Sequence, residues 1–206
     1  MPMHSPEFLA GQESGMMKEK KMNKVRSIKT PLTEEVITSL NAGDMVLLSG
    51  EVYTARDVAH LRLYESLLKG EKLPVDLSQT VLFYAAPSPT PPKKVIGSIG
   101  PTTSYRMDFF TPKLIENGLK GMIGKGNRSP EVVEAIKKHN AVYFGAIGGI
   151  AALMSQCVKK VELIAYEDLE PEAIRKLTLV DLPLVVINDS QGNDLYHSEQ
   201  TKWRIL

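Results

Sequence analysis

The sequence predicts an α/β protein in which helices and strands alternate along one domain. From Val25 onward, segments with apolar residues at helical spacing alternate with short, continuous apolar runs. Several of these segments end at a glycine, and the chain has no internal repeat and no low-complexity segment. With 206 residues, 43% hydrophobic and 24% charged, the chain is long enough to bury a substantial core and has an ordinary globular composition.

The first half of the chain is expected to form helices at 33–43 and 54–70 and strands at 44–50 and 80–87. Thr33 is a good N-cap for the first helix, and Gly43 suits the position just after its end. The apolar run "DMVLLSG" is a strand closed by Gly50. The second helix carries an apolar face and stops at Gly70, and "TVLFYAAP" is a strand ended by the cluster "PSPTPP".

The second half repeats the alternation. Helices are expected at 111–118, 129–140, 148–158 and 170–177, and strands at 121–126, 141–147, 161–166 and 182–189, followed by the turn "SQGN" and a final short strand. Thr111 and Ser129 each precede a proline, which is the pattern of a cap residue followed by the first helical position. In the helix at 129–140, acidic residues come first and lysines last, as the helix dipole favours.

Composition restricts the function classes. Lys plus Arg is 25 and Asp plus Glu is 24, so no global field attracts nucleic acid or an acidic membrane, and any anion site must be built locally. The one cysteine, Cys157, lies in an apolar run and is expected to be a buried thiol, and it cannot hold a zinc ion or an iron–sulfur cluster alone. The four histidines are scattered, so we predict no metal site in this chain. This cysteine usage fits the cytoplasm.

Residues 1–24 lack the apolar core of a signal peptide, and no apolar run reaches the roughly 18 residues that a membrane span needs. We assign residues 1–24 to a disordered leader or to vector-derived sequence, and residues 25–206 to a single domain. The segment "PSPTPP" is the only candidate hinge, and we interpret it as an internal loop.

Arg56 is the first candidate for binding an anion. If Thr54 caps the helix at 54–70, Asp57 falls at the third helical position, where its carboxylate can return to the cap. Arg56 then lies in the first turn, where a cation is mildly unfavourable unless an anion shares the position. Backbone N–H groups and the guanidinium would face the same carboxylate or phosphate. The alternative is an ordinary surface arginine.

Two further loops carry a cation beside glycine. In "GSIGPTTSYRMD", Thr102, Thr103 and Ser104 follow Gly-Pro, so their hydroxyls and N–H groups are expected to converge near Arg106. In "MIGKGNRS", Lys125 stands between two glycines, where the backbone can approach a ligand closely. Taken singly, these segments also suit a hydroxyl-rich helix cap and a polar turn. Together with Arg56, they predict a site for a small polyanion.

The motifs of three common sites, namely the P-loop, the dinucleotide-binding loop and the hydrolase nucleophile elbow, are missing from the sequence. Residue 119 is Leu and residue 126 is Gly, so the glycines around Lys125 are not a P-loop. The chain has neither a G-x-G-x-x-G after a strand nor a G-x-S-x-G nucleophile elbow.

Five motifs in order resemble the C-terminal domain of class I, iron–sulfur-dependent fumarate hydratases, which is a separate beta subunit in two-chain members. These motifs are "SGEVYTARDVAHLRL", "GSIGPTTSYRMD", "GMIGKG", "YFGAIGGIAALMSQCVKKVE" and "LPLVVINDSQGNDLY". The similarity runs from about Gly43 to Tyr196, and L-tartrate dehydratase beta subunits look similar as well. The resemblance implies a swivelling β/β/α domain, with mixed sheets and flanking helices, and reversible hydration of fumarate to L-malate. It also implies a partner alpha subunit that holds a [4Fe–4S] cluster, while this chain binds none.

The resemblance also implies roles for individual residues. Arg56, Arg106 and Lys125 would bind the carboxylates of the substrate. Thr102 would lie beside the carbon that loses its proton, as a base or proton relay that an alpha-subunit carboxylate must activate. His60, with Thr103 and Asp57, would form a supporting shell.

Three functions therefore stay open at this point. The first is the beta subunit of a fumarate hydratase, inactive without its alpha subunit, and the second is the beta subunit of an L-tartrate dehydratase. The third, from another class, is a non-catalytic anion-binding module. The surface meant for the alpha subunit is expected to be partly apolar, so the isolated chain could form a homo-oligomer.

Overall fold

The computed structural model describes residues 25–204, so the predicted leader at 1–24 lies outside the described residues. In chain order the elements are β1 (Arg26–Lys29), α1 (Glu34–Thr38), β2 (Met45–Thr54), α2 (Asp57–Lys69), β3 (Val81–Phe83), η1 (Ser104–Met107), α3 (Thr111–Glu116), β4 (Gly121–Gly124), α4 (Pro130–Lys138), β5 (Val142–Gly145), α5 (Ala151–Cys157), β6 (Val158–Ala165), η2 (Glu167–Glu172), β7 (Ile174–Asn188) and α6 (Leu195–Trp203). The α/β class predicted from the alternating pattern is confirmed.

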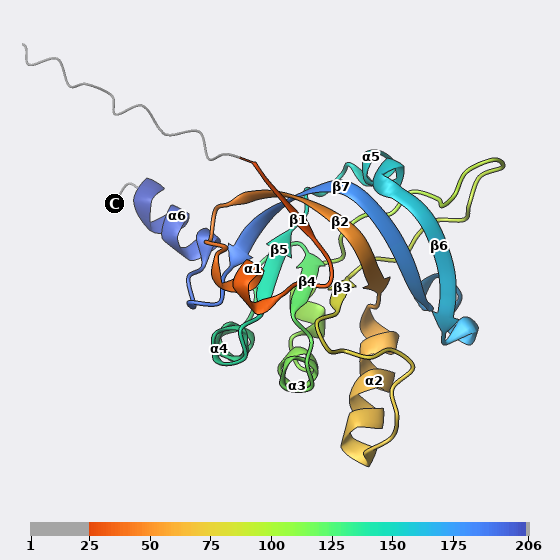
Figure 1. The fold of residues 1–206 in the computed structure, drawn as a ribbon, viewed down its shortest axis with the longest axis horizontal. Helices are drawn as coiled ribbons and strands as arrows, with labels where there is room; N and C mark the ends of the chain where they lie inside the picture. The colour runs from red at the N-terminus through yellow and green to blue at the C-terminus, as the bar shows by residue number, and fades with distance from the viewer. Residues whose placement is uncertain (1–24, 205–206) are drawn as a thin grey trace, which may run out of the picture.

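The strands form one mixed sheet in the order β1-β2-β3-β4-β5-β7-β6. Neighbours from β1 to β5 are parallel, whereas β7 runs antiparallel to β5 and to β6. Because β7 also pairs with β2, the strands β2, β3, β4, β5 and β7 close into a barrel. Figure 1 shows the long, curved strands β2 and β7 on one side and helices α2, α3 and α4 on the other.

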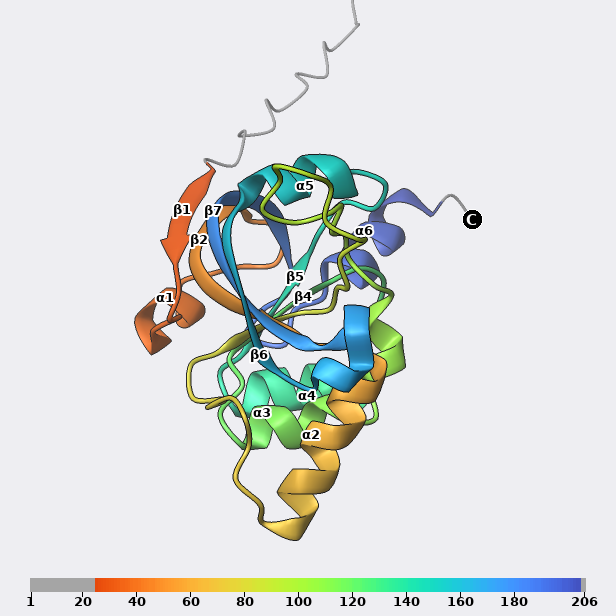
Figure 2. The same ribbon diagram turned by 90° about the vertical axis from the view of Figure 1, so that its right-hand side faces the viewer.

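Alternating side chains along the strands supply two separate cores. On β3, β4 and β5, Phe83, Ile123 and Phe144 belong to the first core, which includes residues of all five barrel strands and so fills the barrel. Leu82 and Met122 point the other way, into the second core, which the helices α2, α3 and α4 cover. Figure 2 shows these three helices below the barrel and α5 above it. Both faces of the short central strands are therefore buried, as their continuous apolar runs indicate.

Strand β2 does not end at Gly50, contrary to the prediction. The pairing with β7 shifts register between Leu48 and Gly50, which has a φ of 108°, and the strand continues to Thr54. A Cβ at Gly50 would lie 2.3 Å from the Thr30 hydroxyl oxygen, so the glycine permits a close approach inside a strand.

The C-terminal part differs from the prediction in two elements. The segment 170–177 was expected to be a helix, but Ile174 to Leu177 belong to β7, which pairs with both β2 and β6. Pairing on both edges overrides the local helical pattern. The expected final strand is instead the helix α6, in which the Asp194 carboxylate accepts a hydrogen bond from the N–H of His197 at 3.1 Å.

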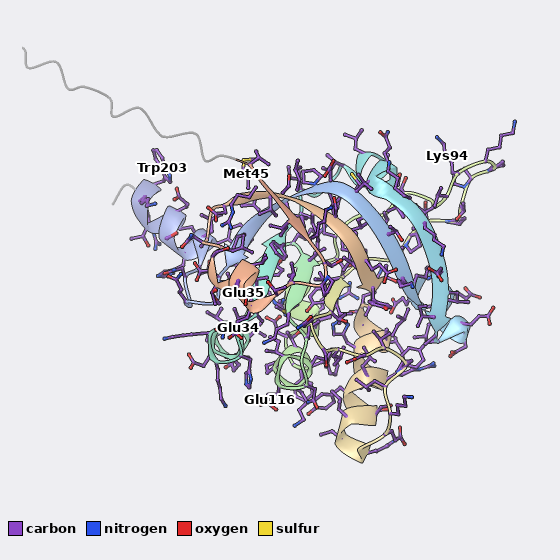
Figure 3. All side chains as sticks on the ribbon, viewed as in Figure 1. Glu34, Glu35, Met45, Lys94, Glu116 and Trp203 are labelled. Carbon is purple, nitrogen blue, oxygen red and sulfur yellow. The ribbon has the colours of Figure 1, made fainter. Side chains whose placement is uncertain are left out.

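The proline-rich segment is an internal loop between β3 and η1, as predicted, and strands before and after it belong to the same sheet. Lys94 lies at the projecting tip of this connection (Figure 3). Several predicted caps are confirmed, including Thr33 on α1, Ser129 on α4 and Gly70 after α2. Among the helices of residues 25–204, none has the length and apolar character needed to cross a bilayer.

Candidate active site

The residues predicted to bind an anion follow the carboxyl ends of neighbouring parallel strands. Arg56 follows β2, Thr102 lies on the connection after β3, and Lys125 directly follows β4. The connection after β3 returns to the sheet, because the Thr102 N–H donates to the Tyr84 carbonyl at 2.6 Å. In α/β sheets the carboxyl edge of parallel strands is the usual position of a ligand site.

Asp57 joins two of the predicted site residues. One carboxylate oxygen lies 3.1 Å from Nε of Arg56, and the other lies 2.9 Å from Nη2 of Arg106. The three side chains stay partly open to solvent, with exposed fractions of 24% for Arg56 and Asp57 and 43% for Arg106. The two guanidiniums thus converge on one carboxylate at the molecular surface, which is the geometry that a carboxylate ligand would need.

This geometry corrects the expected capping box. Thr54 is buried in β2 and does not cap α2, because its hydroxyl donates to the Ala173 carbonyl at 3.2 Å and accepts from the Arg175 N–H at 3.0 Å. Arg56 itself is the N-cap residue and Asp57 is the first helical residue. The carboxylate of Asp57 is therefore directed to arginines and not back to the cap.

Glu172 is a further member of the site that no sequence pattern indicated. One of its carboxylate oxygens lies 3.4 Å from Nη2 of Arg56, and the other accepts from the N–H of Val58 at 3.3 Å. The residue lies at the end of η2, in the segment that was misinterpreted as a helix. Glu172 is thus a second carboxylate partner of Arg56, from a distant part of the chain. It also accepts from the Val58 N–H, one of the N–H groups at the start of α2 that have no partner within the helix.

The loops that carry Thr102 and Lys125 are hydrogen-bonded to each other. Lys125 donates from its N–H to the Thr102 carbonyl at 3.3 Å, and its own carbonyl accepts from the Ser104 N–H at 2.9 Å. Within residues 25–204 the Lys125 side chain is exposed and forms no ion pair, so its ammonium group is available to a ligand. Thr102 and Thr103 are half-buried beside it.

The hydroxyl row does not converge as predicted. The N–H groups of Thr102 and Ser104 are used in the backbone bonds just described, so neither faces a ligand. Ser104 is fully buried and its hydroxyl contacts the hydroxyl of Tyr143 at 3.0 Å, while Thr103 makes no side-chain cap bond to η1. Ser104 is therefore occupied in the core, whereas the hydroxyls of Thr102 and Thr103, both half-buried, are left as candidates for chemistry.

His60 lies behind Arg56, wholly inside the protein. Its Nδ1 is 3.2 Å from the Arg56 carbonyl oxygen, and its ring contacts Tyr84 edge to face at 4.9 Å between centroids. Burial lowers the pKa of His60 to about 4, so the ring is neutral at pH 7. This position fits support of Arg56 and not contact with a substrate.

A buried ion pair lies beneath the site, and the sequence pattern did not indicate it. Nε of Arg128 donates to Asp108 at 2.7 Å and Nη2 donates to the Thr111 hydroxyl at 2.9 Å, with the guanidinium over the rings of Tyr84 and Tyr143. Asp108 also accepts from the Ser129 N–H at 2.6 Å. Thr111 is thus occupied here, and Phe110 stands at the N-cap of α3 that Thr111 was predicted to fill. The pair joins the segment after Arg106 to the loop after Lys125.

Potential metal-ligating side chains are not clustered within the described residues. No group of three or more His, Cys, Asp or Glu side chains in residues 25–204 is arranged to hold a metal ion. Cys157 is half-buried against the first core and not fully buried as expected, and burial raises the pKa of its thiol. A thiol that stays protonated is a poor metal ligand.

Comparison with known proteins agrees with the motifs. The family model "Fumarase C-terminus" matches residues 4–199. A class I, aerobic fumarate hydratase of Salmonella typhimurium is 40% identical over 156 residues, which are 75% of this chain and 27% of that protein. Fumarate hydratase 2 of Leishmania major is 36% identical over 173 residues, or 82% of this chain and 30% of that protein.

A shorter relative matches over most of its own length. A Methanocaldococcus jannaschii protein, provisionally named L(+)-tartrate dehydratase subunit beta, is 37% identical over 177 residues, which are 83% of this chain and 91% of that protein. The chain therefore spans less than a third of the fumarate hydratases cited above but most of this beta subunit. The chain belongs to the fumarase C-terminus family.

Proposed function

We propose that this chain is the beta subunit of a hydro-lyase that interconverts fumarate and L-malate. The observation that carries the proposal is the convergence of Arg56 and Arg106 on the carboxylate of Asp57, on the same edge of the sheet as Thr102 and Lys125. Its relatives named as fumarate hydratases, at 36–40% identity, support the same class of reaction.

A dicarboxylate suits the charges of this edge. Arg56 and Arg106 already bind the carboxylate of Asp57, and they can bind a substrate carboxylate either beside Asp57 or in its place. The ammonium group of Lys125, which is exposed, is available to the other carboxylate of the substrate. Removal of a proton beside a carboxylate builds further negative charge on the substrate. Fixed cations at that point lower the barrier, each typically by about 3 kcal/mol.

Thr102 is the proposed proton-transfer residue. A threonine hydroxyl is a weak base, and the described residues supply no carboxylate bonded to it. We infer that a partner alpha subunit provides the activating group. The same partner would hold the [4Fe–4S] cluster, since the single cysteine of this chain cannot. When bound, such a cluster supplies a Lewis-acidic iron for the substrate hydroxyl.

Exposed aromatic residues beside Arg106 support a partner at this edge. Tyr105 is 67% exposed and Phe109 is 74% exposed, and Arg106 lies between them in the chain. Large apolar side chains around a charged site are typical of surfaces that another polypeptide covers.

L-tartrate dehydration is the second candidate, because the Methanocaldococcus jannaschii relative with that name matches over 91% of its length. Tartrate is also a dianion, and the same cations would bind it. A non-catalytic anion-binding module is the remaining alternative, and the free Lys125 and shared Asp57 also suit it.

The test is anaerobic production of this chain together with its candidate alpha subunit, followed by assays of fumarate hydration and L-tartrate dehydration. We expect fumarate turnover in the complex and a loss of about 10²- to 10³-fold in kcat/KM for Arg106→Ala, because one transition-state cation is removed. Arg62→Ala is the matched control, since Arg62 lies on α2 but pairs with Asp168 at 2.8 Å.

Each outcome selects one function. Turnover of tartrate alone would assign the chain to the second candidate. A cluster-loaded complex that turns over neither substrate would leave the anion-binding module. Equal losses in Arg106→Ala and Arg62→Ala would show that the Asp57 cluster is not the site.

A further inference from the structure

The hydroxyl of Tyr143 joins the two loops that carry the candidate chemistry. It donates to the Gly126 carbonyl at 2.9 Å and lies 3.0 Å from the hydroxyl of Ser104. A carbonyl only accepts, so the Tyr143 proton is directed to Gly126 and Ser104 must donate to the Tyr143 oxygen. The result is a directional chain of hydrogen bonds from Ser104 through Tyr143 to Gly126.

The two ends of this chain stand next to the predicted site residues. Ser104 lies two residues from both Thr102 and Arg106, and Gly126 directly follows Lys125. Two backbone hydrogen bonds, at 2.9 and 3.3 Å, also join the two loops, and the Arg128–Asp108 pair joins them further along the chain. The hydroxyl of Tyr143 differs from these connections because it comes from outside both loops, from β5 in the sheet.

The surroundings of Tyr143 hold it in place. Its ring is fully buried in the second core, and the Arg128 guanidinium lies 4.9 Å from the ring centroid. Burial raises the pKa of Tyr143, which keeps the hydroxyl protonated and able to donate. A Cβ at Gly124 would lie 1.9 Å from the Ser104 hydroxyl oxygen, so the glycine at the end of β4 makes room for Ser104 to reach Tyr143.

We propose that Tyr143 is a positioning residue, whose hydroxyl sets the distance between the loop of Thr102 and Arg106 and the loop of Lys125. The catalytic role of Tyr143 rests on the proposed function. Its role in restraining the two loops rests only on the contacts of its hydroxyl with Gly126 and Ser104. Reacting groups misplaced by about 1 Å can lose on the order of 10²-fold in rate, so a restraint between the proton-transfer loop and the substrate-binding loop matters to the reaction.

Tyr143→Phe is the test variant and Tyr84→Phe is its matched control. Both tyrosines are fully buried in the second core and contact Arg128 through their rings. The Tyr84 hydroxyl, however, contacts the Thr111 hydroxyl at 3.3 Å and the Arg128 side chain at 3.5 Å, and it is bonded to neither Ser104 nor Gly126. Each variant removes one buried hydroxyl and keeps the ring.

Amide hydrogen exchange on the full chain tests the restraint without any activity. In Tyr143→Phe we expect the Ser104 and Lys125 amides to exchange roughly fivefold faster, because a buried hydrogen bond typically contributes about 1 kcal/mol. In Tyr84→Phe these two amides should exchange as in the wild type. Unchanged exchange in Tyr143→Phe, or equal acceleration in both variants, would overturn the restraint.

Steady-state kinetics of the complex test the catalytic role. We expect kcat to fall at least about tenfold in Tyr143→Phe while KM changes less than about threefold, since geometry matters more in the transition state than in ground-state binding. Equal kinetics in Tyr143→Phe and Tyr84→Phe, with an active wild type, would refute positioning. A wild-type complex inactive on fumarate and tartrate would instead refute the proposed function, and with it the catalytic role, whereas hydrogen exchange would still decide whether the loops are joined.

Discussion

At the scale of single residues, His60 shows how burial changes a side chain beside the site. Its Nδ1 faces a carbonyl oxygen, so it must carry the proton, and its Nε2 is buried without a hydrogen-bond partner in the described structure. A charged ring would place a second N–H donor, on Nε2, in the core without an acceptor, and Arg128 adds a like charge nearby. The folded protein therefore stabilises the neutral ring of His60 with its proton on Nδ1.

This predicts a pH dependence of stability. The pKa of His60 is about 4 in the folded chain and near 6.5 when unfolded, so the unfolded chain binds one more proton between these values. His60 therefore favours unfolding progressively as pH falls from about 6.5 to 4, by about 3 kcal/mol in total. Urea unfolding over this range should show that loss in the wild type.

Two variants test this prediction, one that replaces His60 and one that replaces a histidine elsewhere in the chain. His60→Leu should unfold with a smaller loss of stability between pH 6.5 and 4, because nothing titrates at that position. His197→Gln, at an exposed position on α6, should retain the wild-type pH dependence. The same pH dependence in His60→Leu and the wild type would contradict the assignment.

At the scale of elements, the site depends on how η1 and the loop after β4 are held together. Arg128 is fully buried, and its charge is balanced by Asp108, the residue that follows η1. A buried ion pair with one partner removed leaves an uncompensated charge, which typically costs about 3–5 kcal/mol. The pair thus connects two segments whose backbones carry Arg106 and Lys125.

Asp108→Asn should therefore destabilise the chain by about 3–5 kcal/mol while keeping the side-chain volume. Glu116→Gln removes the same charge from an exposed pair with Lys113, at 3.2 Å, and should cost at most about 1 kcal/mol. Chemical denaturation of both variants measures the two values. If they are similar, Arg128 does not need Asp108 as its counter-ion.

The elements that sequence predicts best are those with local causes. The helix α4 has Ser129 as its cap, a proline at its first position and lysines in its last turn, and it forms where expected. Ile174 to Leu177 belong to β7 because β2 and β6 supply partners from distant parts of the chain. A local pattern contains no information about those partners, so the helix predicted there was wrong.

At the scale of the whole molecule, the same distinction applies to the candidate site. Arg56, Arg106 and Lys125 lie on the segments that follow β2, β3 and β4, and parallel pairing brings the ends of those strands to one edge of the sheet. Glu172 and Tyr143 come from distant elements and are identified only by their contacts, at 3.4 Å to Arg56 and 2.9 Å to Gly126. Sequence patterns thus indicate candidate ligand-binding groups, whereas the groups that hold those side chains in place are identified only from the structure.

The surface around Arg106 is expected to be the docking surface for the alpha subunit. Phe109 is 74% exposed and packs against Tyr64 and Phe110, with ring centroids 5.6 and 5.3 Å away. An exposed aromatic side chain supported from behind can enter a partner pocket at little entropic cost. Phe109→Glu should therefore weaken binding of the alpha subunit by roughly 30-fold, which corresponds to about 2 kcal/mol.

The matched control is Trp203→Glu, because Trp203 is 73% exposed and lies on α6, at the end of the molecule marked in Figure 3. Titration of labelled wild-type and variant chains with the alpha subunit under anaerobic conditions measures both affinities, and melting curves show whether each variant is folded. We expect Trp203→Glu to bind as the wild type does, because the Trp203 side chain is bonded to Glu199 of its own helix and, among residues 25–204, to none of the candidate site residues. Weaker binding of Trp203→Glu but not of Phe109→Glu would move the interface to the α6 side, and the alpha subunit would then be unable to supply the group that activates Thr102.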